Sequence, residues 1–173
     1  MKSHLFNLHN SEATITVLCY RRVNAMADSN YDFYQGREKP THHTCAVALI
    51  VRDRRVLMGL REYEKGNPVW TLPGGRCEPD EEPQAGLRRE VAEEIAVTDL
   101  HIVRLLGVKE GAYRDAYGAD QVHMFLCRTE QEPRCLEPEK FLEWRWVGLD
   151  EIPHNLIDSK DADYIKQALQ QPS

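Results

Sequence analysis

The sequence has no long hydrophobic run and no excess of positive charge. No apolar stretch approaches the roughly 20 residues that a membrane-spanning helix needs, and the run at residues 15–20 is too short for the core of a signal peptide. Lys and Arg number 22 against 28 Asp and Glu, a formal net charge of −6. This balance argues against broad binding to nucleic acid polymers or membranes. A small anionic substrate remains possible, because bound cations can reverse the local field.

The cysteines are few and show no pairing motif. There are five, an odd number, and none forms a C-x-x-C pair. The simplest interpretation is reduced thiols in a cytoplasmic protein. A chain of 173 residues is long enough to bury a core without disulfides or structural metal. The five are Cys19, Cys45, Cys77, Cys127 and Cys135.

Strand and helix signals alternate from residue 44 onward. Leu87, Val91 and Ile95 recur at four-residue spacing after Pro83, which predicts a helix with one buried stripe. Strands mixed with two helices predict an α/β or α+β sandwich rather than a doubly wound sheet. We expect strands at 44–51 and 55–60 (a hairpin), 69–72, 100–108, 122–127 and 144–147, and a last helix at 161–169.

The first forty residues carry the weakest signals. Residues 24–40 are mostly polar and end in proline, a pattern that predicts a loop or an arm. Before them, residues 15–23 could form a strand. We therefore expect an N-terminal extension over 1–40 and one domain over 41–173. Dimer contact and disorder are both open for the extension, and the protein is expected to be a monomer or a homodimer.

Three glutamates mark the centre of the sequence. Glu90, Glu93 and Glu94 stand at i, i+3 and i+4 on the predicted helix, within about 100° of arc. Like charges at this spacing cost roughly 0.2–0.5 kcal/mol per pair, and two of them face the negative end of the helix dipole. A positive partner should compensate. Hard divalent cations such as magnesium prefer oxygen ligands and share their shell with substrate phosphates.

The surrounding residues resemble the Nudix box, G-x5-E-x7-R-E-U-x-E-E-x-G-U, where U is aliphatic. Every fixed position matches except the last glycine, which is Ala96 here. Glycine would suit a left-handed C-cap, and alanine there costs about 1 kcal/mol without removing a ligand. The matching stretch is Gly75, Glu81 and then Arg89-Glu90-Val91-Ala92-Glu93-Glu94-Ile95-Ala96-Val97.

The resemblance implies a Nudix α/β/α sandwich with a mixed sheet and a loop–helix–loop that binds magnesium or manganese. Glu90 and Glu94 would be the main ligands, and Glu93 would be a further ligand or would position the attacking water. Arg89 is expected to pair with Glu81 and so to act structurally. The remaining loop residues have lesser implied roles: close backbone approach to metal and phosphates at Gly74 and Gly75, and tuning of the loop at Glu78.

Outside the box the candidates are less specific. Arg61 resembles the phosphate-binding arginine of MutT-like hydrolases, and Arg76 is another phosphate candidate. The Glu137-Pro138-Glu139-Lys140 run before Trp144-Arg145-Trp146-Val147 is similar to a segment of MutT-like nucleoside triphosphate pyrophosphohydrolases. Candidate base-stacking residues are Tyr113, Tyr117 and His123, and candidate general bases outside the box are Glu110 and Asp120.

The resemblance predicts magnesium-dependent hydrolysis of a nucleoside triphosphate to the monophosphate and pyrophosphate. Three alternatives remain open: a dinucleoside polyphosphate hydrolase, for which a tyrosine near the position of Tyr113 is a hint, a nucleoside diphosphate sugar hydrolase, and a nucleotide sensor without turnover. The intact Glu90, Glu93 and Glu94 set argues against the sensor. The expected partner is a small nucleotide, with neither a nucleic acid polymer nor a membrane.

Overall fold

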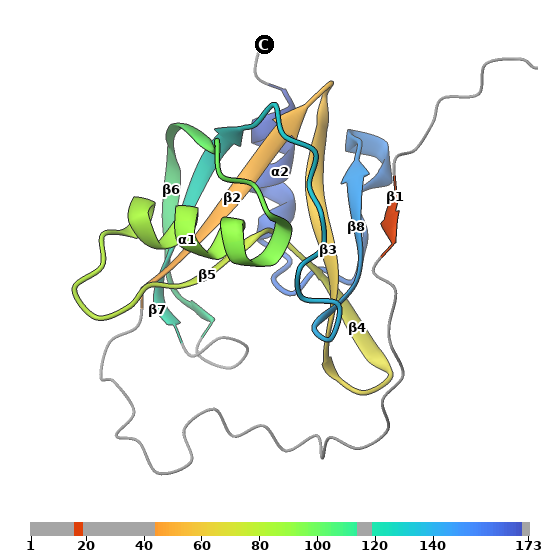
Figure 1. Ribbon diagram of the computed structural model, residues 1–173, viewed down its shortest axis with the longest axis horizontal. Helices are drawn as coiled ribbons and strands as arrows, with labels where there is room; N and C mark the ends of the chain where they lie inside the picture. The colour runs from red at the N-terminus through yellow and green to blue at the C-terminus, as the bar shows by residue number, and fades with distance from the viewer. Residues whose placement is uncertain (1–15, 19–43, 114–118, 171–173) are drawn as a thin grey trace, which may run out of the picture.

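The computed structural model describes residues 16–18, 44–113 and 119–170. Figure 1 shows a twisted sheet with α1 on one side and α2 on the other. None of the helices in the described ranges is long and apolar enough to cross a membrane. The elements in chain order are β1 (Thr16–Leu18), β2 (Thr44–Arg52), β3 (Arg55–Glu64), β4 (Asn67–Thr71), β5 (Gly74–Arg76), α1 (Pro83–Ile95), β6 (His101–Tyr113), β7 (Ala119–Arg128), β8 (Phe141–Val147), a 3-10 turn (Leu149–Glu151) and α2 (Asp161–Leu169).

The sheet is mixed, as the resemblance implies. Its main path runs β1-β8-β3-β2-β7-β6, with β4 paired to β3 and β5 paired to β2. Among the pairings between the described strands, only β2–β7 is parallel. The predicted β2–β3 hairpin is confirmed: Arg52 pairs with Arg55, and the two turn residues Asp53 and Arg54 both have positive φ, as a type I′ turn requires.

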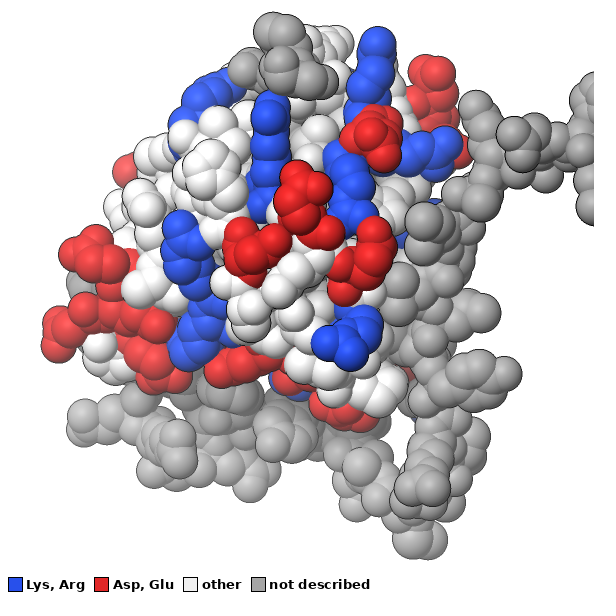
Figure 2. Space-filling view, turned by 45° about the horizontal axis from the view of Figure 1, so that its top comes forward, with Lys and Arg blue, Asp and Glu red and all other residues white. Residues whose placement is uncertain are grey.

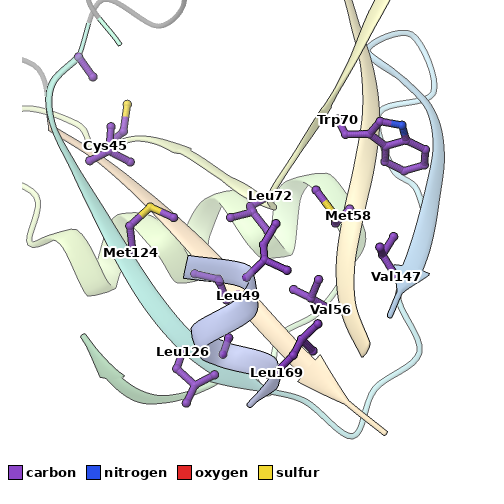
Figure 3. Close-up of a cluster of buried hydrophobic side chains, with 14 residues drawn as sticks. Cys45, Leu49, Val56, Met58, Trp70, Leu72, Met124, Leu126, Val147 and Leu169 are labelled. Carbon is purple, nitrogen blue, oxygen red and sulfur yellow. The ribbon is translucent and has the colours of Figure 1, made fainter. Parts of the chain in front are cut away.

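Two hydrophobic clusters cover the two faces of the sheet. Leu87, Val91 and Ile95 of α1 are fully buried in one cluster, which confirms the predicted stripe. The other cluster, shown in Figure 3, packs Ile165 and Leu169 of α2 against the opposite face. This arrangement is the α/β/α sandwich. It fixes α1, and therefore the three glutamates, over one end of β2 and β5.

Strand β6 forms the edge of the sheet, and its pairing with β7 is irregular. The register shifts three times, between Ile102 and Arg104, between Leu105 and Gly107, and between Glu110 and Tyr113. Each shift places one extra residue on β6 relative to β7, the pattern of a β-bulge. The strand extends to Tyr113, five residues beyond the predicted end at residue 108.

Two expectations need correction. Strand β5 was not predicted, because glycine and a Pro-Gly-Gly sequence signal a turn; tertiary pairing of Gly74 with Val47 and of Gly75 with Ala46 forms it instead. The second concerns the thiols. Cys45, Cys77 and Cys127 are free, whereas Cys135 is disulfide-bonded. The expectation of reduced thiols throughout is wrong at Cys135, because C-x-x-C spacing reports only on cysteines that are close in sequence.

Candidate active site

Glu94 is a buried acid at the end of α1. Its side chain is only 3% exposed, and the backbone N–H of Gly74 donates a 2.9 Å hydrogen bond to its Oε2. Burial raises the pKa of this carboxyl to about 8, against the lowering effects of the Gly74 hydrogen bond and of Arg61. A buried carboxylate is costly unless a cation or further donors compensate it. The position therefore suits a metal ligand.

Glu90 lies one turn earlier on the same helix, against β5. A Cβ placed on Gly75 would come within 2.4 Å of Glu90 Oε2, so only glycine leaves room for this carboxylate. Burial raises the pKa of Glu90, while hydrogen bonding and charge from Arg89 lower it. Gly74 and Gly75 thus bring the backbone and the two carboxylates into close contact. Their expected approach to a metal and to phosphates stays a prediction.

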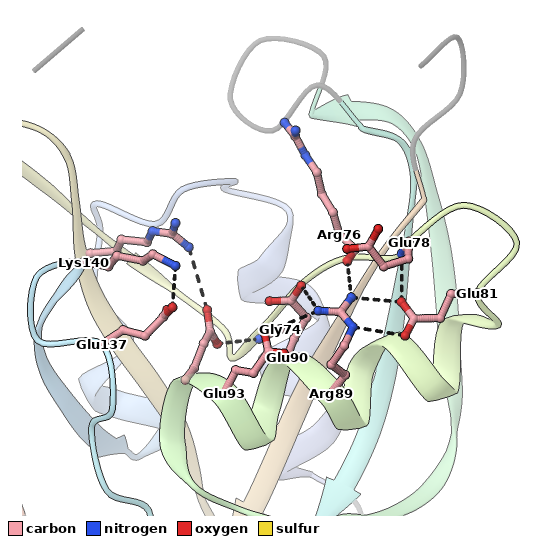
Figure 4. A network of polar contacts seen from close by, with 11 residues as sticks. Gly74, Arg76, Glu78, Glu81, Arg89, Glu90, Glu93, Glu137 and Lys140 are labelled. Carbon is pink, nitrogen blue, oxygen red and sulfur yellow. Dashed lines mark hydrogen bonds and ion pairs between the residues drawn. The ribbon is translucent and has the colours of Figure 1, made fainter. Parts of the chain in front are cut away.

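Arg89 connects the loop to the helix. Its guanidinium donates to Glu81 through Nε (3.1 Å) and Nη2 (2.9 Å), and Nη2 also reaches the Arg76 carbonyl at 2.8 Å. Nη1 donates to Glu90 Oε1 at 2.8 Å. The side-chain hydrogen bond from Arg89 lowers the pKa of Glu81, and the Glu81 carboxylate raises that of Arg89. The predicted Arg89–Glu81 pair is confirmed, and Figure 4 shows the network.

Glu93 differs from its two neighbours. Its side chain is 57% exposed, and its nearest described cation is Arg89, at 3.5 Å. The described residues contain no group of three His, Cys, Asp or Glu side chains already arranged to hold a metal ion. The donor set still fits a hard divalent cation, because Glu90 and Glu94 offer shielded carboxylate oxygens with too few protein donors. The structure thus brings Glu90 and Glu94 together and leaves Glu93 at the solvent edge.

Arg61 reaches the site from β3. Its Nη1 lies 3.8 Å from Glu94 Oε1, and its guanidinium stacks over the rings of Tyr63 (4.5 Å) and Phe141 (5.2 Å). These contacts place the predicted phosphate-binding arginine directly beside the buried acid. Arg76 behaves differently: its backbone carbonyl supports Arg89, while its side chain extends away from the acidic residues in Figure 4.

Two residues of the site were not predicted. Glu137 and Lys140 form an ion pair, and in Figure 4 they lie at the end of the network opposite Glu78 and Glu81. Glu137 acts on Glu94 by raising its pKa, an effect smaller than that of burial. The sequence signal for this pair is the E-P-E-K run, which indicates substrate class by resemblance but does not place the two side chains in the site.

The remaining candidates lie elsewhere or are not described. Glu78 is exposed, and its backbone N–H donates to Glu81 Oε2 at 2.8 Å, which supports the loop. His123 stacks on Phe125 in β7, and burial lowers its pKa. Glu110 lines a cleft of about 660 Å³ between β6 and α2, and the glutamates of α1 do not line that cleft.

Three more candidates, Tyr113, Tyr117 and Asp120, fall between residues 113 and 120 of the sequence. The backbone of Tyr113 ends β6 and pairs with Ala119, whereas Tyr117 falls outside the described residues. Asp120 is half-buried on β7. Of the two candidate bases outside the box, Glu110 lies in the cleft beside α2 and Asp120 lies on β7. The role of either residue as a base stays a prediction.

Ala96 ends α1 in the left-handed conformation, with φ 58° and ψ 25°, and its N–H donates to the Ala92 carbonyl. This is the conformation that a glycine would favour at the same position. The departure from the box is therefore tolerated structurally, and no ligand is lost. Residues 41–168, which include the whole site, match the family described as "NUDIX domain".

The chain belongs to the Nudix family. A MutT-like protein of Streptomyces ambofaciens is 35% identical over 75 residues, which cover 43% of this chain and 47% of that protein. An RNA pyrophosphohydrolase of Caulobacter vibrioides (strain NA1000 / CB15N) is 31% identical over 147 residues, covering 73% of this chain and 84% of that protein. A MutT NUDIX hydrolase of Burkholderia pseudomallei, known as a crystal structure, matches with a TM-score of 0.55 and 27% identity, covering 78% of this chain and 100% of that chain.

These similarities identify the protein as a Nudix hydrolase, an enzyme with pyrophosphohydrolase activity. The loop–helix–loop that carries Gly74, Gly75 and the α1 glutamates lies within the matched residues 41–168. Nudix hydrolases generally use divalent metal ions, which agrees with the shielded carboxylates of Glu90 and Glu94.

Proposed function

We propose that this Nudix hydrolase cleaves a nucleoside triphosphate to the monophosphate and pyrophosphate, with magnesium as the metal. The observation that carries the proposal is the buried carboxylate of Glu94 beside Glu90 and Arg61. Glu90 and Glu94 would hold the metal, and manganese could replace magnesium. Glu93 would join them or would position the attacking water.

The bound metal would neutralise phosphate oxygens and lower the pKa of a bound water. The protein's own residues supply the rest. Arg61 offers a positive charge to the phosphates, and Arg89 keeps Glu90 oriented through its hydrogen bond. Glu137 is a candidate to accept the proton of the attacking water, because the hydrogen bond from the Leu136 N–H to the Glu94 carbonyl holds its segment beside the end of α1.

The choice of substrate rests on similarity. The E-P-E-K run and the W-x-W-V strand resemble MutT-like triphosphate pyrophosphohydrolases, and one relative is named a MutT-like protein. Charged side chains of both signs are interspersed on the face shown in Figure 2, which agrees with a small nucleotide better than with a long polyanion.

A second candidate substrate is the 5′ phosphate end of an RNA. Relatives named RNA pyrophosphohydrolase align with about 73% of this chain. This reaction would break the same kind of phosphoanhydride bond, so the glutamates of α1 would act in the same way. The difference would lie in how the protein contacts nucleotides beyond the first.

The deciding experiment is product analysis with magnesium. The panel contains nucleoside triphosphates, a 5′-triphosphorylated RNA, dinucleoside polyphosphates and nucleotide sugars, with Glu94→Gln as the inactive control. Monophosphate and pyrophosphate from a free triphosphate would support the proposal. Turnover confined to RNA would favour the second candidate, and turnover of the remaining groups alone would contradict both. Tight binding of a nucleotide without turnover would indicate a sensor.

A further inference from the structure

The segment that carries Glu137 and Lys140 is hydrogen-bonded to two elements of the site, α1 and β3. The backbone N–H of Leu136 donates to the Glu94 carbonyl at 2.9 Å, which ties the segment to the end of α1. At its other end, the Lys140 carbonyl accepts a 3.2 Å hydrogen bond from Glu62 N–H, next to Arg61 on β3. The backbone of Lys140 therefore has a defined place beside the two elements that carry Glu94 and Arg61.

The register of the sheet strengthens this placement. Phe141 pairs with Arg61 across β8 and β3, and Phe141 is fully buried. Lys140 is the residue immediately before this anchored pair. In Figure 4 the Lys140 side chain meets Glu137 near the end of α1 that carries Glu93.

The three cations of the site differ in how firmly they are held. Arg89 is engaged by Glu81, Glu90 and the Arg76 carbonyl. Arg61 lies over the rings of Tyr63 and Phe141 and close to Glu94.

Lys140 has a different environment. Its side chain is 45% exposed, and its ion-pair partner Glu137 is only three residues away. Exposed ion pairs at this spacing contribute little to stability, so they exchange readily for a stronger partner.

We propose that Lys140 binds the polyphosphate chain of the substrate, by exchanging the Glu137 carboxylate for a phosphate oxygen. The inference rests on the proposed triphosphate hydrolysis and adds a substrate-binding residue to the same site. A phosphate chain carries several negative charges where Glu137 carries one, and the ammonium of lysine is a mobile point charge that suits phosphate. The exchange also releases Glu137 from its ion pair while substrate is bound.

The test compares Lys140→Met, Lys140→Arg and a matched control. Lys166→Met removes a lysine of similar exposure, 53% against 45%, on α2 across the sheet. This lysine also forms an i,i+3 ion pair, with Asp163 at 4.0 Å. Two quantities are measured with magnesium: the KM and kcat for a nucleoside triphosphate, and the Kd of inorganic tripolyphosphate by calorimetry. The second needs no turnover.

In Lys140→Met we expect KM and the tripolyphosphate Kd to rise about tenfold or more, the loss typical of one hydrogen bond between charged groups. The kcat should stay within about twofold, as for lost uniform binding. Lys140→Arg should recover most of the affinity, and Lys166→Met should match the wild-type protein. Unchanged KM and Kd in Lys140→Met would show that the inference is wrong. A change confined to kcat and its pH profile would also overturn it, because Lys140 would then act through Glu137.

The two proposals can fail separately. A wild-type protein that binds tripolyphosphate through Lys140 but does not hydrolyse triphosphates would support the inference and contradict the proposed function. If the wild-type protein hydrolyses triphosphates, and Lys140→Met has the same KM and Kd as wild type, the proposed function is supported and the inference is wrong.

Discussion

Gly74 donates its backbone N–H to a carboxylate that lies twenty residues later in the chain, Glu94 Oε2, at 2.9 Å. This hydrogen bond joins the glycine turn to the last turn of α1. It is also one of the few favourable contacts of a carboxyl group that is almost fully buried. The site therefore contains an acid whose charged form depends on a cation for compensation.

The first prediction concerns the pH dependence of stability without metal. Burial raises the pKa of Glu94 from 4.5 to about 8 in the folded protein. Between these values the unfolded state releases a proton that the folded state retains, so the free energy of unfolding falls as pH rises. Glu94→Gln lacks this proton. Its stability advantage over wild type, measured by urea denaturation with a chelator, should grow from pH 4.5 to 8 and then level off.

Metal supplies the control for this prediction. At pH 8, magnesium should raise the stability of the wild-type protein more than that of Glu94→Gln, because only the folded wild-type site binds it with both carboxylates. A stability difference that does not change with pH would show that Glu94 is not protonated in the folded protein.

The second prediction concerns Gly75. A Cβ at this position would displace the Glu90 carboxylate, 2.4 Å away, so Gly75→Ala should weaken metal binding by roughly 10- to 100-fold. The free energy of unfolding should change little, because the end of a side chain can move. Gly66→Ala is the matched control: Gly66 has φ +83° and open space around it, so it should lose about 1 kcal/mol of stability and keep metal affinity. Calorimetric titration and urea denaturation distinguish the two patterns.

The third prediction concerns the Arg89–Glu81 pair. Lysine cannot reproduce the forked contacts of Arg89, so Arg89→Lys should destabilise the protein. In a double-mutant cycle with Glu81→Gln, we expect a coupling energy of about 1 kcal/mol or more. The exposed Arg55–Glu151 pair, at 3.3 Å, provides the comparison cycle, for which about 0.2–1 kcal/mol is typical. Equal coupling in both cycles would mean that the Arg89 network has no special structural role.

The fourth prediction concerns the helix C-cap. Because Ala96 has positive φ, Ala96→Gly should stabilise the protein by about 1 kcal/mol, which corresponds to a Tm increase of about 2–4 °C for a chain of this size. Ala92→Gly, within the same helix, should instead destabilise it by about 0.5–1 kcal/mol. Thermal unfolding of the two variants tests the assignment, and loss of stability in both would contradict it.

Local patterns predicted much of this structure. Helix α2 has the bounds expected from the sequence, and the two-residue turn at Asp53 and Arg54 forms the expected hairpin. The Arg89–Glu81 pair was also expected, because both residues belong to one short motif. In each case the determining residues lie close together in the chain.

Contacts between distant segments could not be predicted in the same way. Strand β5 exists because Gly74 and Gly75 pair with β2, which strand propensity does not reveal. The approach of Arg61 to Glu94 depends on how β3 lies relative to α1. The Glu137–Lys140 pair is local, but its place near Glu90 and Glu94 follows from hydrogen bonds between the segment and α1, which the sequence alone does not specify.

The three bulges of β6 have a consequence for the behaviour of the protein at high concentration. Strands at the edge of a sheet can recruit a second chain, and flat, regular edges are the most prone to such aggregation. The extra residues at each register shift interrupt the regular spacing of N–H and C=O groups along β6. A straight incoming strand could pair with only a few residues before losing register. The irregular edge should therefore protect this acidic protein from edge-to-edge assembly along β6.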